Sequence, residues 1–244
     1  MSGTLENPFI RAETERFGLE ASKLHNPLMP TYAQRGEDLI VEALLHAHLA
    51  KQGRHWDSLF YIEIGANHPI STSNTYLLYS SRGASGVLVE PNPELHPLIA
   101  KARARDTLVA AAILPAPQPS VTLHIGNAHE LTSVDAAHVE SFGAFGGAGG
   151  IRNRIEVPGI GINELFAAHA ANRPFDFLSI DCEGIDHELA KAIDFETFKP
   201  AVVQLEPSDH FFPGARARMV NLMESRSYRL VAMTEINVIF LRAW

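Results

Sequence analysis

A series of short apolar segments, several of them separated by stretches long enough for a helix, limits what this sequence can fold into. Strands that are apolar throughout and alternate with helices are typical of a mostly parallel sheet buried on both faces. The last two segments lie too close together for a crossover helix, so they predict an antiparallel hairpin at one edge of the sheet. The expected fold class is therefore α/β, with helices on both faces. The segments are "LFYIEIGA", "GVLVEPN", "TLVAAAIL", "SVTLHIGN", "FDFLSIDC", "AVVQLEP", "YRLVAMT" and "NVIFLRAW".

The length of the chain, 244 residues, suits one large domain with an extension. We expect an N-terminal arm over residues 1–30, where the periodicity is weak and prolines recur, and a single domain over residues 31–244. The arm carries apolar side chains for which self-association is the best account, so the sequence favours a homo-oligomer held through the arm. These side chains are Phe9, Ile10, Phe17 and Leu19.

The composition points to a cytoplasmic protein without a membrane span. No apolar run approaches the roughly 20 residues of a membrane helix, and the first residues lack the basic-then-apolar order of a secretory signal. Cys182 is the only cysteine and cannot form an internal disulfide. The net charge is −8, from 20 basic and 28 acidic residues. Because binding to a phosphate backbone depends on Lys and Arg, nucleic acid is not an expected partner.

Basic residues nevertheless gather in two places, where we favour solvent-exposed helix faces over contact with an anionic substrate. The two groups are Lys101, Arg103 and Arg105, and Arg216, Arg218, Arg226 and Arg229.

Two further segments have a predicted conformation. "YAQRGEDLIVEALLHAHLAKQG" predicts a helix packed on the sheet, with Glu37 and Asp38 at its favourable negative end and Gly53 after its last turn. The glycine-rich segment "FGAFGGAGG", Phe142 to Gly150, predicts a mobile loop that serves either as a lid or as a surface linker.

The loop within "YIEIGANHPISTSNTYLLY" decides what kind of ligand the sheet can bind, because ligands of open α/β sheets lie beyond the carboxyl ends of the strands. A dinucleotide loop needs three glycines near the pyrophosphate. Only Gly65 fits, since Asn67 and Ile70 occupy the other positions and Pro69 lacks a backbone donor. The side chains of this loop can contact an ammonium, a carboxylate and hydroxyls, so a zwitterionic ligand suits it better. They are Glu63, Asn67, Ser71, Thr72, Ser73 and Asn74.

Glu90, at the end of "GVLVEPNP", can accept hydrogen bonds from both hydroxyls of a ribose. Together with Glu63 it suggests an adenosine that carries an amino acid, as in S-adenosylmethionine. The alternative treats Glu63 as a strand-end charge bound to neighbouring backbone, and Glu90 as an acid at a helix N-terminus.

Taken together, the motifs resemble those of the FkbM-type methyltransferases from Tyr32 to Arg242. The resemblance implies a Rossmann-like class I methyltransferase fold, S-adenosylmethionine as cofactor, and usually O-methylation of sugars, glycans or natural products. A common form of the family loop has glycine where Pro69 stands, which bears on the backbone path and not on the class. The matching segments are "YAQRGED", "YIEIGANHPISTSNTYLLY", "GVLVEPNP", "RARDTLVAAAI", "FDFLSIDCEGIDHELAKAID", "KPAVVQLE" and the closing hairpin "SYRLVAMTEINVIFLR".

Acidic residues follow two later segments, in "SIDCEGIDHE" and "LEPSDH". A sugar hydroxyl is a weak acid, so its methylation needs a base or a divalent cation near the attacking oxygen. Resemblance to class I methyltransferases implies that Asp181 lies near the sulfonium and the acceptor, which it would orient or deprotonate. Glu183, just before the sharp turn that Gly184 permits, is a second catalytic candidate; in the alternative interpretation, Glu183 and Asp186 cap the following helix. His210 is a further candidate base, because histidine ionises near neutrality.

A metal site is an open alternative at the same place. Oxygen ligands from Asp181, Glu183 and Glu206 would suit Mg²⁺ or Ca²⁺, whereas no Cys/His spacing predicts a zinc site. Resemblance also suggests that "YAQRGED" lines the cofactor or acceptor pocket, through Tyr32, Gln34 and Glu37. The competing interpretation makes Gln34 to Asp38 a cap for the helix.

The sequence thus favours an S-adenosylmethionine-dependent O-methyltransferase acting on a saccharide or a glycosylated natural product. N-methylation of a small molecule needs less help from a base and stays open, as does a cofactor-binding module without turnover. An oxidoreductase would share the acid at Glu90 but needs glycines that this loop lacks.

Overall fold

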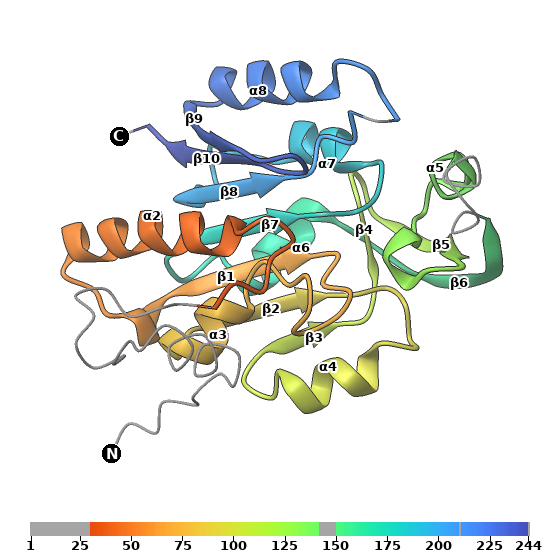
Figure 1. The fold of residues 1–244 in the computed structure, drawn as a ribbon, viewed down its shortest axis with the longest axis horizontal. Helices are drawn as coiled ribbons and strands as arrows, with labels where there is room; N and C mark the ends of the chain where they lie inside the picture. Colours follow the sequence, from red (N-terminus) through yellow and green to blue (C-terminus); the bar gives the residue numbers. More distant parts are fainter. Residues whose placement is uncertain (1–29, 142–149, 210, 244) are drawn as a thin grey trace, which may run out of the picture.

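The computed structural model describes residues 30–141, 150–209 and 211–243, and its centre is a seven-stranded sheet (Figure 1). The strand order is β3-β2-β1-β7-β8-β10-β9, and all pairs are parallel except those of β10 with β8 and β9. The expected Rossmann-like class I methyltransferase fold with a C-terminal antiparallel hairpin is confirmed. The strands are β1 Phe60–Ile64, β2 Ser85–Val89, β3 Thr107–Val109, β7 Phe177–Ile180, β8 Val202–Leu205, β9 Tyr228–Met233 and β10 Val238–Arg242.

Helices cover both faces of this sheet, because alternate side chains of a strand point to opposite faces. From β1, Ile62 and Ile64 pack with α6, α7 and α8, whereas Tyr61 packs with α2, α3 and α4. Burial on both faces explains why these strands are apolar throughout. The helices are α2 Glu37–Gln52, α3 Tyr76–Arg82, α4 His96–Ala102, α6 Ile162–His169, α7 Asp186–Ala192 and α8 Ala215–Ser225, with short 3₁₀ turns at Trp56–Ser58 and His129–Leu131.

The predicted first helix is α2. Its first turn contains Glu37 and Asp38, and it ends at Gly53, which has a left-handed φ of 64°. The Gly53 N–H donates to the Ala50 carbonyl at 3.2 Å and so satisfies one of the free carbonyls at the helix end.

A second, three-stranded sheet was not expected. It has the order β4-β6-β5, with β4 Ala112–Leu114, β5 Gln118–Gly126 and β6 Ile151–Gly161. The prediction of a single strand over "TLVAAAIL" was wrong, because the chain leaves the main sheet after β3 and enters the second sheet at β4. The sequence does not reveal this change of sheet, since both halves of the segment are apolar. The second sheet lies to one side of the main sheet and is followed by α6 (Figure 1).

Several sequence predictions concern residues outside the described ones. They are the N-terminal arm before residue 30, the loop from Phe142 up to Gly150, and the candidate base His210. Within residues 30–141, 150–209 and 211–243, no helix combines the length and the hydropathy needed to cross a lipid bilayer.

Candidate functional site

A cavity lies at the carboxyl ends of β1, β2 and β7, on the side where the second sheet adjoins them. Its empty volume is about 790 Å³ when its open mouth is included, within the range of small-molecule sites. The main sheet and the loops after its strands contribute Ile64, Gly65, Ala66, Asn67, Thr72, Asn74, Val89, Glu90, Pro91, Asp181, Cys182, Glu183 and Ile185. The other walls are Gln34, Ala111, Ala112, Ile113, Leu123, Glu130, Thr132, Ser133 and Val134.

Gly65 forms the floor of the cavity where β1 ends. Its φ is +81°, and a Cβ at this position would lie 1.8 Å from the carbonyl oxygen of Asp181. The backbone N–H groups of Gly65 and Ala66 both donate to the Val89 carbonyl, each at 3.0 Å. Only glycine allows the ends of β1 and β7 to approach this closely.

The loop after Gly65 brings some of its predicted ligand residues to the cavity and not others. Asn67 and Asn74 line the cavity, as does Thr72, whereas Ser71 and Ser73 do not. Asn67 and Thr72 have positive φ values of 45° and 63°, so the loop follows a path that residues other than glycine rarely adopt.

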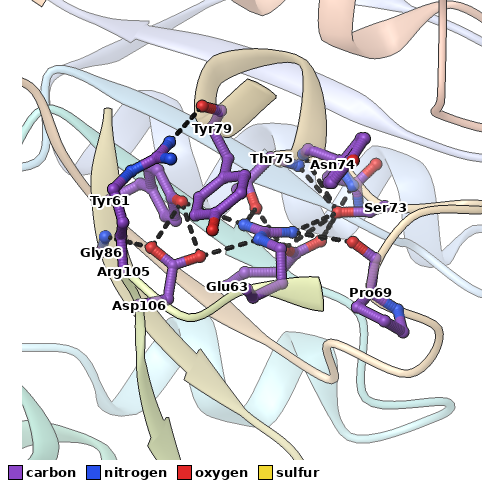
Figure 2. A network of polar contacts seen from close by, with 12 residues as sticks. Tyr61, Glu63, Pro69, Ser73, Asn74, Thr75, Tyr79, Gly86, Arg105 and Asp106 are labelled. Atoms are coloured by element: carbon purple, nitrogen blue, oxygen red, sulfur yellow. Dashed lines mark hydrogen bonds and ion pairs between the residues drawn. The ribbon is translucent and has the colours of Figure 1, made fainter. Parts of the chain in front are cut away.

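Glu63 is also absent from the cavity wall, although the sequence predicted that it contacts the ligand. Its buried carboxylate accepts hydrogen bonds from the Asn74 N–H at 2.8 Å and from the Thr75 hydroxyl. Figure 2 shows this carboxylate surrounded by polar groups of the loop. The alternative interpretation, a strand-end charge bound to neighbouring backbone, therefore describes Glu63 better.

The two basic groups differ in their surroundings. The expected solvent exposure is confirmed for Lys101, Arg105, Arg218, Arg226 and Arg229. It is wrong for Arg103, whose side chain is fully buried against Asp106. Arg105 places its guanidinium 3.8 Å from the centroid of the Tyr79 ring.

Glu90 lies at the end of β2 with its carboxylate on the cavity wall. It is 4% exposed and accepts hydrogen bonds from the backbone N–H groups of Asn67 at 2.8 Å and Asn92 at 2.7 Å. Burial raises the pKa of Glu90 to about 7, against the effect of these two bonds. Each carboxylate oxygen can accept a further bond, so Glu90 can still bind two hydroxyls of a ligand.

Three carboxyl groups meet beside the cavity: Asp181 and Glu183, after β7, line it, and Glu206, after β8, lies next to them without lining it. One oxygen from each lies within 4.8 Å of the other two. Burial raises the pKa of all three. Asp181 and Glu206 share a hydrogen bond, which two carboxyl groups can form only when one is protonated. Burial and the neighbouring Asp181 raise the pKa of Glu206 well above its usual range.

The same three oxygens are suitable ligands for a divalent cation. Three carboxylate oxygens from separate residues form a hard donor set of the kind that Mg²⁺ prefers. The predicted metal ligands are thus brought together by the fold.

Glu183 has a partner that the sequence did not suggest. Its carboxylate lies 2.9 Å from Nε2 of His138, a buried residue of α5, Ala136–Ser141. Burial lowers the pKa of His138 and raises that of Glu183, so both shifts favour the neutral forms. His138 was missed because a lone histidine on a short helix has no sequence pattern, and α5 lies between β5 and β6 of the second sheet instead of after a strand of the main sheet.

Neither Asp186 nor Glu183 caps α7, whose N-cap residue, Ile185, has no side-chain cap hydrogen bond; Asp186 instead holds the turn that precedes the helix. Its carboxylate accepts hydrogen bonds from the N–H groups of Cys182 at 3.0 Å and Gly184 at 3.3 Å, which fixes the turn between β7 and α7. Glu183, with a φ of +54°, points its backbone carbonyl at the Ser133 hydroxyl, 2.7 Å away.

In the segment "YAQRGED", one residue lines the cavity and two others make contacts with other parts of the chain. Gln34 lines the cavity. The Tyr32 ring packs edge-on against Tyr76, with centroids 4.8 Å apart, and Glu37 accepts a hydrogen bond from the Thr234 hydroxyl at 2.6 Å. Glu37 therefore joins the start of α2 to the β9–β10 hairpin instead of facing a ligand.

The chain matches a known protein family. The family model described as "Methyltransferase FkbM domain" matches residues 63–230. No curated protein matches the chain in sequence.

Three of the solved structures to which the chain is similar, all at low sequence identity, are methyltransferases. A precorrin-6y C5,15-methyltransferase from Geobacter metallireducens has a TM-score of 0.45 at 14% identity, over 89% of this chain and 93% of that chain. A TehB-like SAM-dependent methyltransferase from Corynebacterium glutamicum has a TM-score of 0.39 at 10% identity, over 97% and 100%. A Burkholderia thailandensis 1,6-didemethyltoxoflavin-N1-methyltransferase with bound S-adenosylhomocysteine has a TM-score of 0.38 at 11% identity, over 100% and 94%.

Proposed function

Because this chain belongs to the FkbM methyltransferase family and is an S-adenosylmethionine-dependent methyltransferase, we propose that it methylates a hydroxyl of a sugar, a glycan or a glycosylated natural product. The observation that carries the proposal is the cluster of three carboxyls from Asp181, Glu183 and Glu206, of which Asp181 and Glu183 line the cavity. A weakly acidic hydroxyl needs such a proton acceptor, whereas a neutral amine needs less help.

In this proposal the cofactor lies across the carboxyl ends of β1 and β2. Glu90 accepts hydrogen bonds from the ribose hydroxyls with the capacity left on its two oxygens. Asn67, Thr72 and Asn74, which line the cavity, bind the methionine end, and Gln34 lines the cavity as well. The adenosine and methionine ends are then held at fixed positions, which directs the sulfonium toward the carboxyls of Asp181, Glu183 and Glu206.

The chemical step is an in-line displacement at the methyl carbon. The acceptor oxygen forms a bond to the methyl group as the bond from methyl to sulfur breaks, and S-adenosylhomocysteine is the leaving group. Asp181 accepts the hydroxyl proton. The hydrogen bond between Glu206 and Asp181 holds the Asp181 side chain in place. Glu183 and the predicted base His210 are further candidates for contact with the acceptor.

The same three carboxyls lead us to propose that the site binds a divalent cation. Asp181, Glu183 and Glu206 would supply the ligands, and a bound Mg²⁺ would lower the pKa of a coordinated hydroxyl. In that case the three side chains orient the acceptor through their oxygens instead of taking its proton directly.

The test uses radiolabelled S-adenosylmethionine with a panel of monosaccharides and glycosides and a matched panel of the corresponding amino sugars. Each reaction is run with Mg²⁺ and with EDTA. Label transferred to hydroxyl acceptors supports the proposal, and loss of transfer in EDTA supports the cation. Transfer only to amines would refute O-methylation.

A further inference from the structure

The buried guanidinium of Arg103 lies beneath the loop that lines the cofactor cavity. Arg103 follows α4, and its side chain is 0% exposed. It also faces the Tyr79 ring, with 4.8 Å between the guanidinium carbon and the ring centroid. A charge is rarely buried unless specific partners compensate for its lost hydration, so its contacts show what it is for.

The hydrogen bonds of Arg103 use all five N–H groups that a guanidinium has. Three of the five acceptors, those of Pro69, Ser73 and Thr75, belong to the loop that precedes α3. The acceptors are Asp106 Oδ2 at 2.8 Å for Nε, the Pro69 carbonyl at 3.0 Å and Ser73 Oγ at 3.2 Å for Nη1, and Tyr61 Oη at 3.0 Å and Thr75 Oγ1 at 2.7 Å for Nη2.

Glu63 completes the same network from the end of β1. The Thr75 hydroxyl accepts from Arg103 and donates to Glu63, so it joins the two buried charges. Ser73 Oγ lies 3.4 Å from the Glu63 carboxylate and accepts from Arg103. Burial raises the pKa of Glu63, and the positive charge of Arg103 opposes that shift. Figure 2 shows the labelled members of this network on one side of the loop.

The ligand-facing residues alternate along the loop with residues held by Arg103. Thr72 and Asn74 line the cavity, while Ser73 between them turns toward the guanidinium. Thr72 has a φ of +63°, a conformation that persists only when surrounding contacts enforce it. The contacts of Arg103 with Pro69 and Ser73 lie on either side of this residue.

We propose that Arg103 is a positioning residue that, with Glu63, holds the loop from Pro69 to Thr75 in the shape that binds the methionine end of S-adenosylmethionine. The inference rests on the proposed contact of this loop with the cofactor. It assigns Glu63 to the support of the loop, where its charge balances that of Arg103, and not to the ligand.

The experiment compares Arg103→Lys with a matched control, Arg54→Lys. Arg54 donates to both oxygens of the buried Asp176, at 2.6 and 2.9 Å, next to the first residue of β1 and away from the cavity. Calorimetric titration with S-adenosylmethionine gives Kd, and thermal denaturation gives the stability of each protein. The KM and kcat for methyl transfer separate loop positioning from damage to the chemical step.

Arg103→Lys keeps the charge but not the five-donor fork. We expect it to raise the Kd and the KM for S-adenosylmethionine about tenfold, the factor that corresponds to losing one buried hydrogen bond to a charged group. The kcat should stay within about threefold of the wild type, because Arg103 does not touch the acceptor site. Arg54→Lys should lower Tm and leave Kd within about twofold.

An unchanged Kd in Arg103→Lys, or an equal rise in both variants, would overturn the inference. Should Arg103→Lys fail to fold, Ser73→Ala removes one contact of the guanidinium without leaving a lone charge, and a Kd equal to that of the wild type would overturn it. Failure of the wild-type protein to bind S-adenosylmethionine would instead refute the cofactor site itself, and the inference with it.

Discussion

The pH dependence of cofactor binding should be set by Glu90. Burial raises its pKa to about 7 in the free protein. Ribose hydroxyls donate their hydrogens to the ionised carboxylate, so the ionised form is the binding form. The affinity is therefore full above pH 8 and falls as the pH drops through 7. At pH 6 only about a tenth of the protein is ionised at Glu90, so Kd should be about tenfold higher than at pH 8.

Glu90→Gln isolates this effect. Glutamine keeps one acceptor oxygen, is neutral, and turns an NH₂ group toward a backbone N–H that now donates to the carboxylate. Hydrogen bonds to charged groups contribute roughly 1.5–3 kcal/mol, so Kd at pH 8 should rise about 10- to 100-fold. Glutamine does not titrate, so the Kd of the variant should lack this pH dependence. The Kd of the variant divided by that of the wild type should therefore fall about tenfold between pH 8 and pH 6.

The assay is calorimetric titration with S-adenosylmethionine at half-unit pH intervals from 6 to 8.5. Any titration of the ligand appears equally in both proteins and cancels in the ratio. Glu94→Gln is the matched control, because Glu94 is exposed and pairs with Arg152 at the surface. A constant ratio of Kd values across this range, or wild-type affinity in Glu90→Gln, would show that Glu90 does not bind the ribose.

Three further changes test the site and the fold. Asp181→Asn should lower kcat by about 10²- to 10⁴-fold in the methyl-transfer assay, with a much smaller effect on the Kd for the cofactor; wild-type turnover would rule out Asp181 as the proton acceptor. Gly65→Ala should lower the free energy of unfolding by about 3 kcal/mol or more in urea denaturation, since its Cβ would lie 1.8 Å from a carbonyl oxygen. Gly83→Ala is the control, because its φ is also positive but no atom lies within 4 Å, and it should cost about 1 kcal/mol. Asp176→Asn should cost about 3 kcal/mol at pH 7; burial opposes ionisation, but the bonds that Asp176 accepts hold its pKa below the usual range, so the loss should shrink as the pH falls through that lowered pKa.

The sequence alone determined that the main sheet is mostly parallel with an antiparallel hairpin, and which residues follow its strands. Strands buried on both faces must be apolar throughout, which made β1, β2, β7 and β8 recognisable, and the short connection before β10 predicted the hairpin. Residues that directly follow such strands must meet at one edge of the sheet. Gly65, Glu90 and Asp181 could therefore be assigned to one cavity without coordinates.

Only the tertiary structure decided which side chains share a contact. Glu63 and Ser73 have the same residue types as ligand-binding groups, but a guanidinium from a later helix end, that of Arg103, draws them to the other side of the loop. His138 reaches Glu183 because the second sheet places α5 beside the turn after β7. Periodicity reports which face of an element is buried, whereas these pairings depend on where segments distant in the chain come to lie and on backbone angles within loops.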